Sequence, residues 1–343
     1  MRKLSAIALS ALCGATLLFA QEAPTGSSTN IESADQALLT ALKGTIKGKI
    51  VWCSSRANSK HDIWIMNADG TEQKALTIAP NTVDWFPRFS SDGKQVVFTR
   101  SKMGWVKESD AEMFDKWDIW TINTDGTGEK KVAENASWGS WRPGDQEILF
   151  SRGAKVFIKK LADGAETEIF DADVSIKKGT FAQEPQLSPN GKFLAITLRG
   201  TSRETGIFNL EKKVWYKTGG GCEITWFPDN SKVVRMNEGQ GNGGTEVLCI
   251  PVDADGKPTI KMDDLSIPKE ARMMDIPGRR SHEYFPKVSN NGTWLVWGAT
   301  QIGHEHDLAD YEIYIWKIGT EQKSATRLTF HSGNDRWPDL FVE

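Results

Sequence analysis

A pattern of apolar and polar positions recurs along the chain from residue 49 to the C-terminus. In each copy a short apolar segment leads into a polar turn and then into a second, alternating apolar segment. The copies read WFPRFSSDGKQVVFTR from residue 85, WGSWRPGDQEILFSR from 138, EPQLSPNGKFLAITLR from 184, EITWFPDNSKVVRMN from 223, YFPKVSNNGTWLVWGA from 284 and, in part, WPDLFVE from 337. Alternating segments rich in β-branched and aromatic residues indicate antiparallel strands, so each copy predicts two strands joined by a tight turn.

Each copy continues into a third and a short fourth strand. The third strands read DIWIMNADGT from 62, DIWTINTDGT from 118, VFIKKLADGA from 156, EVLCIPVDADG from 246 and EIYIWKI from 312. Several end in Asp-Gly, a strong hairpin signal because glycine adopts positive φ at little cost. We therefore predict a four-stranded meander per unit, with strands a to d. A repeat of about 50 residues is in the range typical of propeller blades.

The two ends of the repeat region each contain part of a unit. One residue near the start of strand a serves as an anchor position, occupied in turn by Pro87, Gly139, Pro185, Ile224, Pro286 and Pro338. The last anchor is followed by strand a alone, whereas residues 49–77 supply strands b, c and d without a preceding strand a. The sequence thus predicts an all-β, six-bladed β-propeller of four-stranded antiparallel blades over residues 49–343. Pairing of its N- and C-terminal strands would close the ring and remove exposed sheet edges.

The segments FPRFSSDGKQVVFTR, EPQLSPNGKFLAI and DIWIMNADGT resemble the TolB-like, or PD40-repeat (WD40-like), family of β-propellers. The resemblance covers nearly all of residues 49–343 and implies the propeller fold. It implies no single function, because the family includes Tol-system components, protease-associated propellers and glycan-active enzymes. TolB itself has a substantial α/β domain ahead of its propeller, which residues 21–48 are too few to form. We therefore predict a relative in fold and not TolB itself.

The N-terminal segment has the composition of a secretory signal. Arg2 and Lys3 precede an apolar stretch that runs to a small residue, Ala20. This pattern predicts a signal peptide over residues 1–20 and a periplasmic or secreted mature protein. The stretch is too short to span a membrane with anchoring flanks, and the sequence has no other candidate transmembrane segment. A lipoprotein anchored through Cys13 is the alternative. Residues 21–48 are predicted to form a tether and a short helix.

Composition narrows the range of partners. The net charge is −3, so no basic excess favours a nucleic-acid partner. Fourteen Trp against four Tyr indicate a repeated core position or a stacking surface.

Cys53, Cys222 and Cys249 are expected to be buried apolar fillers, with a Cys222–Cys249 disulfide as the alternative. We expect a monomer or a subunit of an envelope complex.

Long connections are expected on one face of the ring. In a meander, the a–b and c–d turns lie on one face and the b–c and d–a connections on the other; we call these the short-turn face and the long-loop face. The long connections predicted from the sequence are 101–116, 237–245 and 300–311 between strands b and c, and 167–183 and 261–283 between strands d and a. Long structured loops carry function more often than tight turns do, so we predict that ligands bind on the long-loop face.

Residues that enter strand a at this face would surround the mouth of the central channel. They combine carboxylates, aromatic rings and one Arg, and the predicted binding residues are Asp84, Trp85, Trp138, Glu184, Glu223, Glu283, Tyr284, Arg336 and Trp337. Packing of the aromatic side chains between blades is the alternative interpretation. The carboxylates could also cap backbone N–H groups or pair with Arg100, Arg152 and Arg199.

A second cluster of candidate residues contains three of the five histidines. His304 and His306 lie in one connection, and an H-x-H pair in an extended segment points both imidazoles to one side, as two metal ligands require. The candidate ligands are His282, Gln301, His304, His306 and Asp307. The spacing Gln301-x-x-His304-x-His306 resembles the metal site of oligogalacturonate lyases, which are also propellers. In that family, however, the H-x-H pair lies close to a strand a anchor, whereas here it lies in a b–c connection.

These observations predict a binding or scaffolding module for a protein, peptide or glycan, with no cofactor. The sequence leaves catalysis open and favours a protein that is not an enzyme. The alternative is a metal-dependent carbohydrate lyase or hydrolase that uses a divalent metal held by His282, His304 and His306. No G-x-S-x-G nucleophile motif or phosphate-binding loop is present in the sequence.

Overall fold

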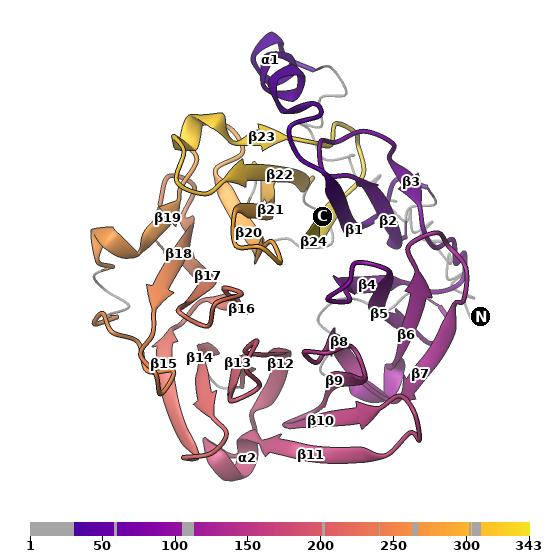
Figure 1. Cartoon of the computed structure of the whole chain (residues 1–343), viewed down its shortest axis with the longest axis vertical. Helices are drawn as coiled ribbons and strands as arrows, with labels where there is room; N and C mark the ends of the chain where they lie inside the picture. Colours follow the sequence, from indigo (N-terminus) through magenta and orange to yellow (C-terminus); the bar gives the residue numbers. More distant parts are fainter. Residues whose placement is uncertain are drawn as a thin grey trace, which may run out of the picture.

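The computed structural model contains six four-stranded antiparallel sheets arranged around one axis (Figure 1). It describes residues 31–57, 60–104, 113–200, 203–239, 241–262, 267–301, 303 and 310–343. Strand a of each sheet lies nearest the axis and strand d lies at the rim. The predicted six-bladed propeller is therefore confirmed.

The blades follow each other along the chain, apart from the one that closes the ring. The closing blade contains β24 (Asp335–Val342), β1 (Gly48–Ser54), β2 (Asp62–Asn67) and β3 (Lys74–Ala75). The second contains β4 (Asp84–Phe89), β5 (Gln95–Ser101), β6 (Trp117–Asn123) and β7 (Lys130–Glu134). The third contains β8 (Ser137–Trp141), β9 (Glu147–Arg152), β10 (Lys155–Lys160) and β11 (Glu166–Asp171).

The other three blades have the same order of strands. The fourth contains β12 (Phe181–Leu187), β13 (Phe193–Arg199), β14 (Arg203–Asn209) and β15 (Val214–Gly219). The fifth contains β16 (Cys222–Trp226), β17 (Lys232–Glu238), β18 (Thr245–Pro251) and β19 (Arg272–Met274). The sixth contains β20 (His282–Val288), β21 (Trp294–Thr300), β22 (Glu312–Lys317) and β23 (Thr326–Arg327).

The ring closes as the sequence predicts, by pairing of β24 with β1. The register runs from Gly48 opposite Val342 to Ser54 opposite Asp335. One blade is thus built from the two ends of the repeat region. Both edges that an open ring would expose are paired in this way.

The a–b turns repeat one hydrogen-bond pattern because they repeat one sequence motif. In the second blade, the Ser90 hydroxyl donates to Asp92 at 2.7 Å and accepts from the Gln95 N–H at 3.0 Å. Gly93 adopts a φ of 68°, a conformation that favours glycine. The same Ser-x-Asp/Asn-Gly arrangement recurs at Ser188 and Ser289. The turn motif therefore fixes the hairpin register in three blades.

Two connections differ from the sequence prediction. Residues 261–283 were expected to join strands d and a, but they contain strand d of the fifth blade, β19. Residues 167–183 likewise contain most of β11. Strand β19 has only three residues, and the first half of β11 is exposed, so neither shows a clear apolar alternation in the sequence. The fifth blade consequently has a long c–d connection, so the short-turn face is not uniformly short.

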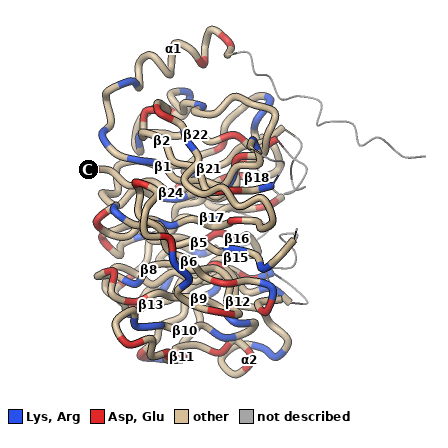
Figure 2. The backbone as a smooth tube through the Cα atoms, turned by 90° about the vertical axis from the view of Figure 1, so that its right-hand side faces the viewer, with Lys and Arg blue, Asp and Glu red and all other residues tan. Residues whose placement is uncertain are grey.

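The helices lie outside the ring of sheets. Helix α1 (Ser33–Leu42) packs against β23, and its Leu42 joins an apolar cluster with Ile46 and Leu328 (Figures 1 and 2). The short helix α2 (Ala172–Ser175) follows β11. Single 3-10 turns span Phe114–Lys116, Lys269–Ala271 and Gln322–Ser324. No helix in the described ranges is long and apolar enough to cross a membrane.

Residues of both charge signs are interspersed along the blades in the view of Figure 2. Cys53, Cys222 and Cys249 are free, and Cys53 is buried. They are therefore not joined in the disulfide that the sequence left as an alternative. The predicted signal peptide and most of the predicted tether, residues 1–30, lie outside the described residues.

Candidate functional site

Every strand a contains a bulge at the residue just before the anchor. At this point the pairing between strands a and b skips a residue in five blades, and the pairing between β24 and β1 shifts as well. The six bulge residues have φ values of 50–61°: Phe86, Trp138, Glu184, Glu223, Phe285 and Trp337. This left-handed conformation is uncommon for large side chains and costs about 1–3 kcal/mol per residue. The fold therefore holds these side chains in a strained conformation around the axis.

Four of the bulge residues are aromatic and meet across the axis. Trp138 contacts Phe86 at 5.0 Å and Trp337 at 6.0 Å between ring centroids, and Phe285 lies 5.1 Å from Trp337. The rings approach edge to face, a favourable geometry for aromatic pairs. We call Phe86, Trp138, Phe285 and Trp337 the aromatic plug. It fills the channel near the middle of strand a.

Two of the nine predicted binding residues, Trp138 and Trp337, belong to this plug, the other seven lie on the same strands a, and all nine are buried. None has more than 6% of its surface exposed. Trp85 packs against Trp337, with ring centroids 5.1 Å apart, and Tyr284 packs against Tyr311 at 5.5 Å. The Arg336 guanidinium lies 4.7 Å from the Trp337 ring. The structure thus brings these residues together, as a packed wall rather than an open mouth.

The predicted carboxylates have partners within the wall. Asp84 forms a two-pronged ion pair with Arg100, both distances being 2.7 Å, as the sequence suggested for one of these acids. Burial nevertheless raises the pKa of Asp84, because loss of water outweighs the Arg100 charge. The carboxylate of Glu223 accepts a hydrogen bond from the Phe285 N–H. Glu184 differs from Asp84 and Glu223 because its Oε2 has no hydrogen-bond partner among the described residues. Burial raises the pKa of Glu184 as well.

Glu283 is a buried carboxylate between the fifth and sixth blades. It accepts hydrogen bonds from the Ile276 N–H at 2.7 Å and from the Thr245 hydroxyl at 3.3 Å. Burial raises its pKa to about 8, with a smaller contribution from the negative charge of Asp275. The Glu283 carboxyl therefore keeps its proton near neutral pH. Through its hydrogen bond with Thr245, Glu283 also connects the fifth and sixth blades.

The predicted metal cluster lies only partly within the described residues. His304, His306 and Asp307 fall outside them. His282 starts β20 opposite Thr300, and Gln301 follows directly, so the fold places His282 and Gln301 at the same end of one hairpin. Gln301 accepts a hydrogen bond from Arg279 at 3.3 Å, and burial lowers the pKa of His282.

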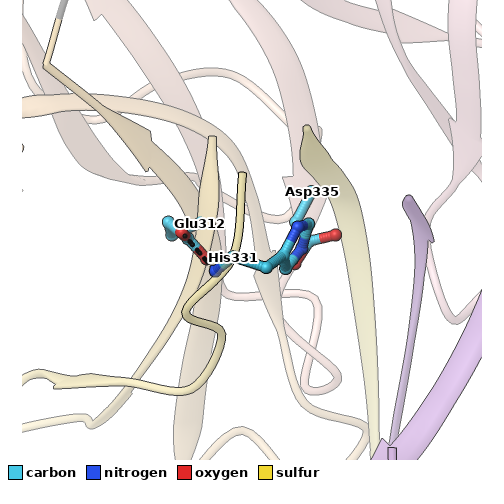
Figure 3. A group of neighbouring side chains, drawn as sticks. All are labelled: Glu312, His331 and Asp335. Atoms are coloured by element: carbon cyan, nitrogen blue, oxygen red, sulfur yellow. Dashed lines mark hydrogen bonds and ion pairs between the residues drawn. The ribbon is translucent and has the colours of Figure 1, made fainter. Parts of the chain in front are cut away.

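A second acidic and histidine cluster was not found from the sequence. Glu312 of β22, His331 and Asp335 of β24 place one potential ligand atom each within 4.8 Å of one another (Figure 3). His331 Nε2 lies 2.6 Å from Asp335, and its Nδ1 accepts from the Gly333 N–H at 2.6 Å. The ring is therefore the tautomer that donates from Nε2 to Asp335.

Both carboxylates of this cluster also carry an Arg partner. Asp335 pairs with Arg56 at 2.7 Å, and Glu312 pairs with Arg327 at 2.8 Å. Burial would raise the pKa of Asp335, but the hydrogen bond from His331 and the Arg56 charge outweigh it and hold that pKa well below its usual range. Burial and the nearby Asp335 raise the pKa of Glu312 to about 7. Both ring nitrogens of His331 are engaged, so a metal ion would have to displace one of their partners, and the arrangement fits an ion-pair brace for the closing blade.

A cavity of about 290 Å³ lies on the axis, on the opposite side of the plug from the long loops. Every blade contributes the residue that follows its anchor: Arg88, Ser140, Gln186, Thr225, Lys287 and Asp339. Residues of the a–b turns, including Ser91, Pro189 and Asn290, line its outer part. This site was not predicted from the sequence, although a polar residue after each anchor is a signal that could have indicated it.

Together, the fold and the plugged channel define a six-bladed, TolB-like β-propeller. TolB from Acinetobacter baumannii superposes with a TM-score of 0.61 and 16% identity, over 88% of this chain and 68% of that one. A TolB candidate from Agrobacterium tumefaciens gives 0.55 and 12%, over 87% and 99%. Hydrazine synthase from Kuenenia stuttgartiensis gives 0.56 and 11%, over 89% of this chain but about half (48%) of that one.

These likenesses confirm the resemblance to TolB-like propellers at the level of the fold. No family model matches the sequence, and no curated protein is similar to it. At identities of 11–16%, the structural neighbours carry no information on what this chain binds.

Proposed function

We propose that this chain is an exported propeller that binds a protein or peptide on its long-loop face and positions it without catalysing a reaction. Exposed apolar side chains carry this proposal. Of the seven large apolar residues that are exposed in the described ranges, five lie on or beside b–c and d–a connections: Ile78, Met103, Met113, Val174 and Phe181. Ile78 and Val174 are 73% and 84% exposed.

Exposed apolar groups on one face are typical of interaction surfaces. Methionine is also enriched in protein interfaces. Its side chain has no strong hydrogen-bonding group for the hydroxyls of a sugar. Among the partners that the sequence allowed, these side chains favour a protein or peptide over a glycan. The buried wall beneath provides the rigid support on which loop-borne binding residues depend.

The proposal is tested by removing the apolar side chains in pairs. We expect Ile78→Ser with Val174→Ser to weaken partner binding at least about tenfold, that is by about 1.4 kcal/mol, without lowering the melting temperature. Val214→Ser is the matched control, because Val214 is 39% exposed but begins β15 at the short-turn face. The readout is affinity for a partner identified by photo-crosslinking from position 174. The proposal would be contradicted if the control lost as much affinity for the partner as the double variant, or if the double variant lost none.

The metal-dependent lyase or hydrolase stays a second candidate because His282 and Gln301 lie at the same end of one hairpin. It requires stoichiometric binding of Mn²⁺, Ca²⁺ or Zn²⁺ that is lost in His304→Ala with His306→Ala. If the purified chain takes up no metal, this candidate is excluded. Export is tested separately, by N-terminal sequencing of the mature protein, which is expected to begin at Gln21.

A further inference from the structure

Four residues that line the axial cavity on the short-turn face carry buried side-chain donors to which no described residue offers an acceptor. They are Arg88 Nε, Gln186 Nε2, Trp226 Nε1 and Lys287 Nζ. Arg88 and Lys287 are 6% and 3% exposed. A buried donor without a partner costs about 1–3 kcal/mol, and more when it is charged. Four such donors around one cavity are consistent with a site whose ligand supplies the acceptors.

Neither cation of the cavity lies within ion-pair distance of a carboxylate in the described residues, although the charges of Lys287 and Arg88 act on the buried Glu184. Arg88 donates to the Pro87 carbonyl at 2.6 Å, and its guanidinium lies 3.8 Å from the Phe86 ring centroid. Lys287 Nζ lies 5.9 Å from the same ring. Both cations thus lie against the Phe86 ring, on residues that line the cavity.

Three carboxylates lie near these cations, and two of them have other partners. Asp339 accepts from the Phe89 N–H at 2.8 Å, and Glu223 accepts from the Phe285 N–H. The third, Glu184, lies one residue before its anchor and does not line the cavity, and burial raises its pKa. The nearby negative charge limits the ligand to a single anionic group.

Apolar side chains form the walls above this floor of donors. They are Phe89, Trp141, Leu187, Trp226, Val288, Leu340 and Phe341. Trp141 is held in place because its indole N–H donates to the Arg88 carbonyl at 3.1 Å. A cavity with apolar walls and a few convergent polar groups is typical of sites for small organic ligands.

We propose that the axial cavity binds the carboxylate of a small ligand or peptide end, with the carboxylate against Arg88 and Lys287 and an apolar body between Trp141 and Trp226. Gln186 and the Trp226 indole supply the further donors. The site lies on the opposite face from the proposed partner surface and does not depend on it.

The proposal includes a dependence of affinity on pH. Burial and the nearby Arg88 lower the pKa of Lys287 to about 7, while Glu184, Glu223 and Asp339 act in the opposite direction. A bound carboxylate favours the charged ammonium, so affinity should fall as the pH rises through about 7. An uncharged ligand of the same shape should show no such fall.

Calorimetry on the mature chain tests the proposal with phenylacetate and its neutral isostere, phenylacetamide. We expect phenylacetate to bind at least about tenfold more tightly, by about 1.4 kcal/mol. A hexapeptide ending in phenylalanine, with a free or an amidated C-terminus, tells a peptide end from a free acid as the source of the carboxylate. Tighter binding of the free-ended peptide than of phenylacetate would identify the peptide end. If neither acid binds, or if each amide binds as well as its acid, the proposal is wrong.

Three variants assign the interaction to the cavity. Lys287→Met should reduce the preference for the acid and remove its dependence on pH near 7, whereas Lys192→Met, at an exposed lysine of an a–b turn on the same face, should leave both unchanged. Trp226→Phe removes the indole N–H donor and should weaken the binding of phenylacetate several-fold. If Lys287→Met does not fold, the pH dependence of affinity in the wild-type chain and the affinity of Trp226→Phe still test the proposal. Affinity that is independent of pH and unchanged in Trp226→Phe would overturn the proposal.

Discussion

At the scale of single residues, the wall of the channel holds acids in environments that oppose their charge. Glu283 is the clearest example, because it has no exposed surface and its pKa is raised to about 8 from an ordinary 4.5. The folded chain therefore keeps a proton that the unfolded chain releases between pH 4.5 and 8. Stability must fall as the pH rises through that window, and it must stay low above pH 8.

Replacing this carboxylate with an amide should remove the pH-dependent loss. The amide oxygen introduced by Glu283→Gln would still accept from the Ile276 N–H. We therefore expect this variant to match the wild type in urea unfolding at pH 5. At pH 8.5 it should be more stable by about 2 kcal/mol or more, since one pKa unit is worth about 1.4 kcal/mol.

The exposed Glu270 provides the control for this experiment, because Glu270→Gln removes one carboxylate without any burial. It should leave the pH profile of stability unchanged. A Glu283→Gln profile parallel to that of the wild type would show that Glu283 is ionised in the fold at neutral pH.

At the scale of elements, the closing blade is braced by buried charge as well as by its strand ladder. Asp335 starts β24, has no exposed surface and binds both Arg56 and His331. Arg56 follows β1, so the brace joins the two ends of the repeat region side chain to side chain. Removing one partner of a buried ion pair leaves the other charge unpaired and costs about 3–5 kcal/mol.

We therefore expect Asp335→Asn to lower the free energy of unfolding at pH 7 by about 3 kcal/mol. The matched control is Asp255→Asn, which breaks the exposed ion pair with Lys212 and should cost about 0–1 kcal/mol. Both are measured by urea denaturation. Equal effects would mean that the brace contributes no more than a surface pair.

At the scale of the whole molecule, closure makes the six blades one cooperative unit. Deleting residues 335–343 removes β24 and exposes the edge of β1. We expect the truncated chain to lose its cooperative unfolding transition and to aggregate, because an unpaired central edge is a template for pairing with other chains.

A circular permutant separates loss of closure from loss of sequence. Here a flexible linker joins Glu343 to Glu32, and new ends open the exposed c–d turn between Asp163 and Gly164. Every strand is retained, so this chain should fold with a single transition and a melting temperature near that of the wild type. An unfolded permutant, or a truncated chain as stable as the wild type, would contradict the closure argument.

The sequence by itself determined the architecture and very little of the site. Strand alternation, the Ser-x-Asp/Asn-Gly turns and the split unit at the two ends are local signals repeated along the chain, and repetition made the blade count and the closure readable. Strand d of the fifth blade was missed because β19 is three residues long and distant along the chain. Trp85, Glu223 and Trp337 lie near the axis on strand a, but they are buried, and their role in binding stays a prediction.

Only the tertiary structure decided what these residues contact. Whether a side chain on strand a reaches the plug, the cavity or a neighbouring blade depends on the bulge at the anchor, which shifts the alternation by one residue. Arg88 and Lys287 are about 200 positions apart in sequence and meet only because the ring closes. Their shared cavity, like the ion pair of Asp335 with Arg56, is a consequence of closure around an axis and has no local signature.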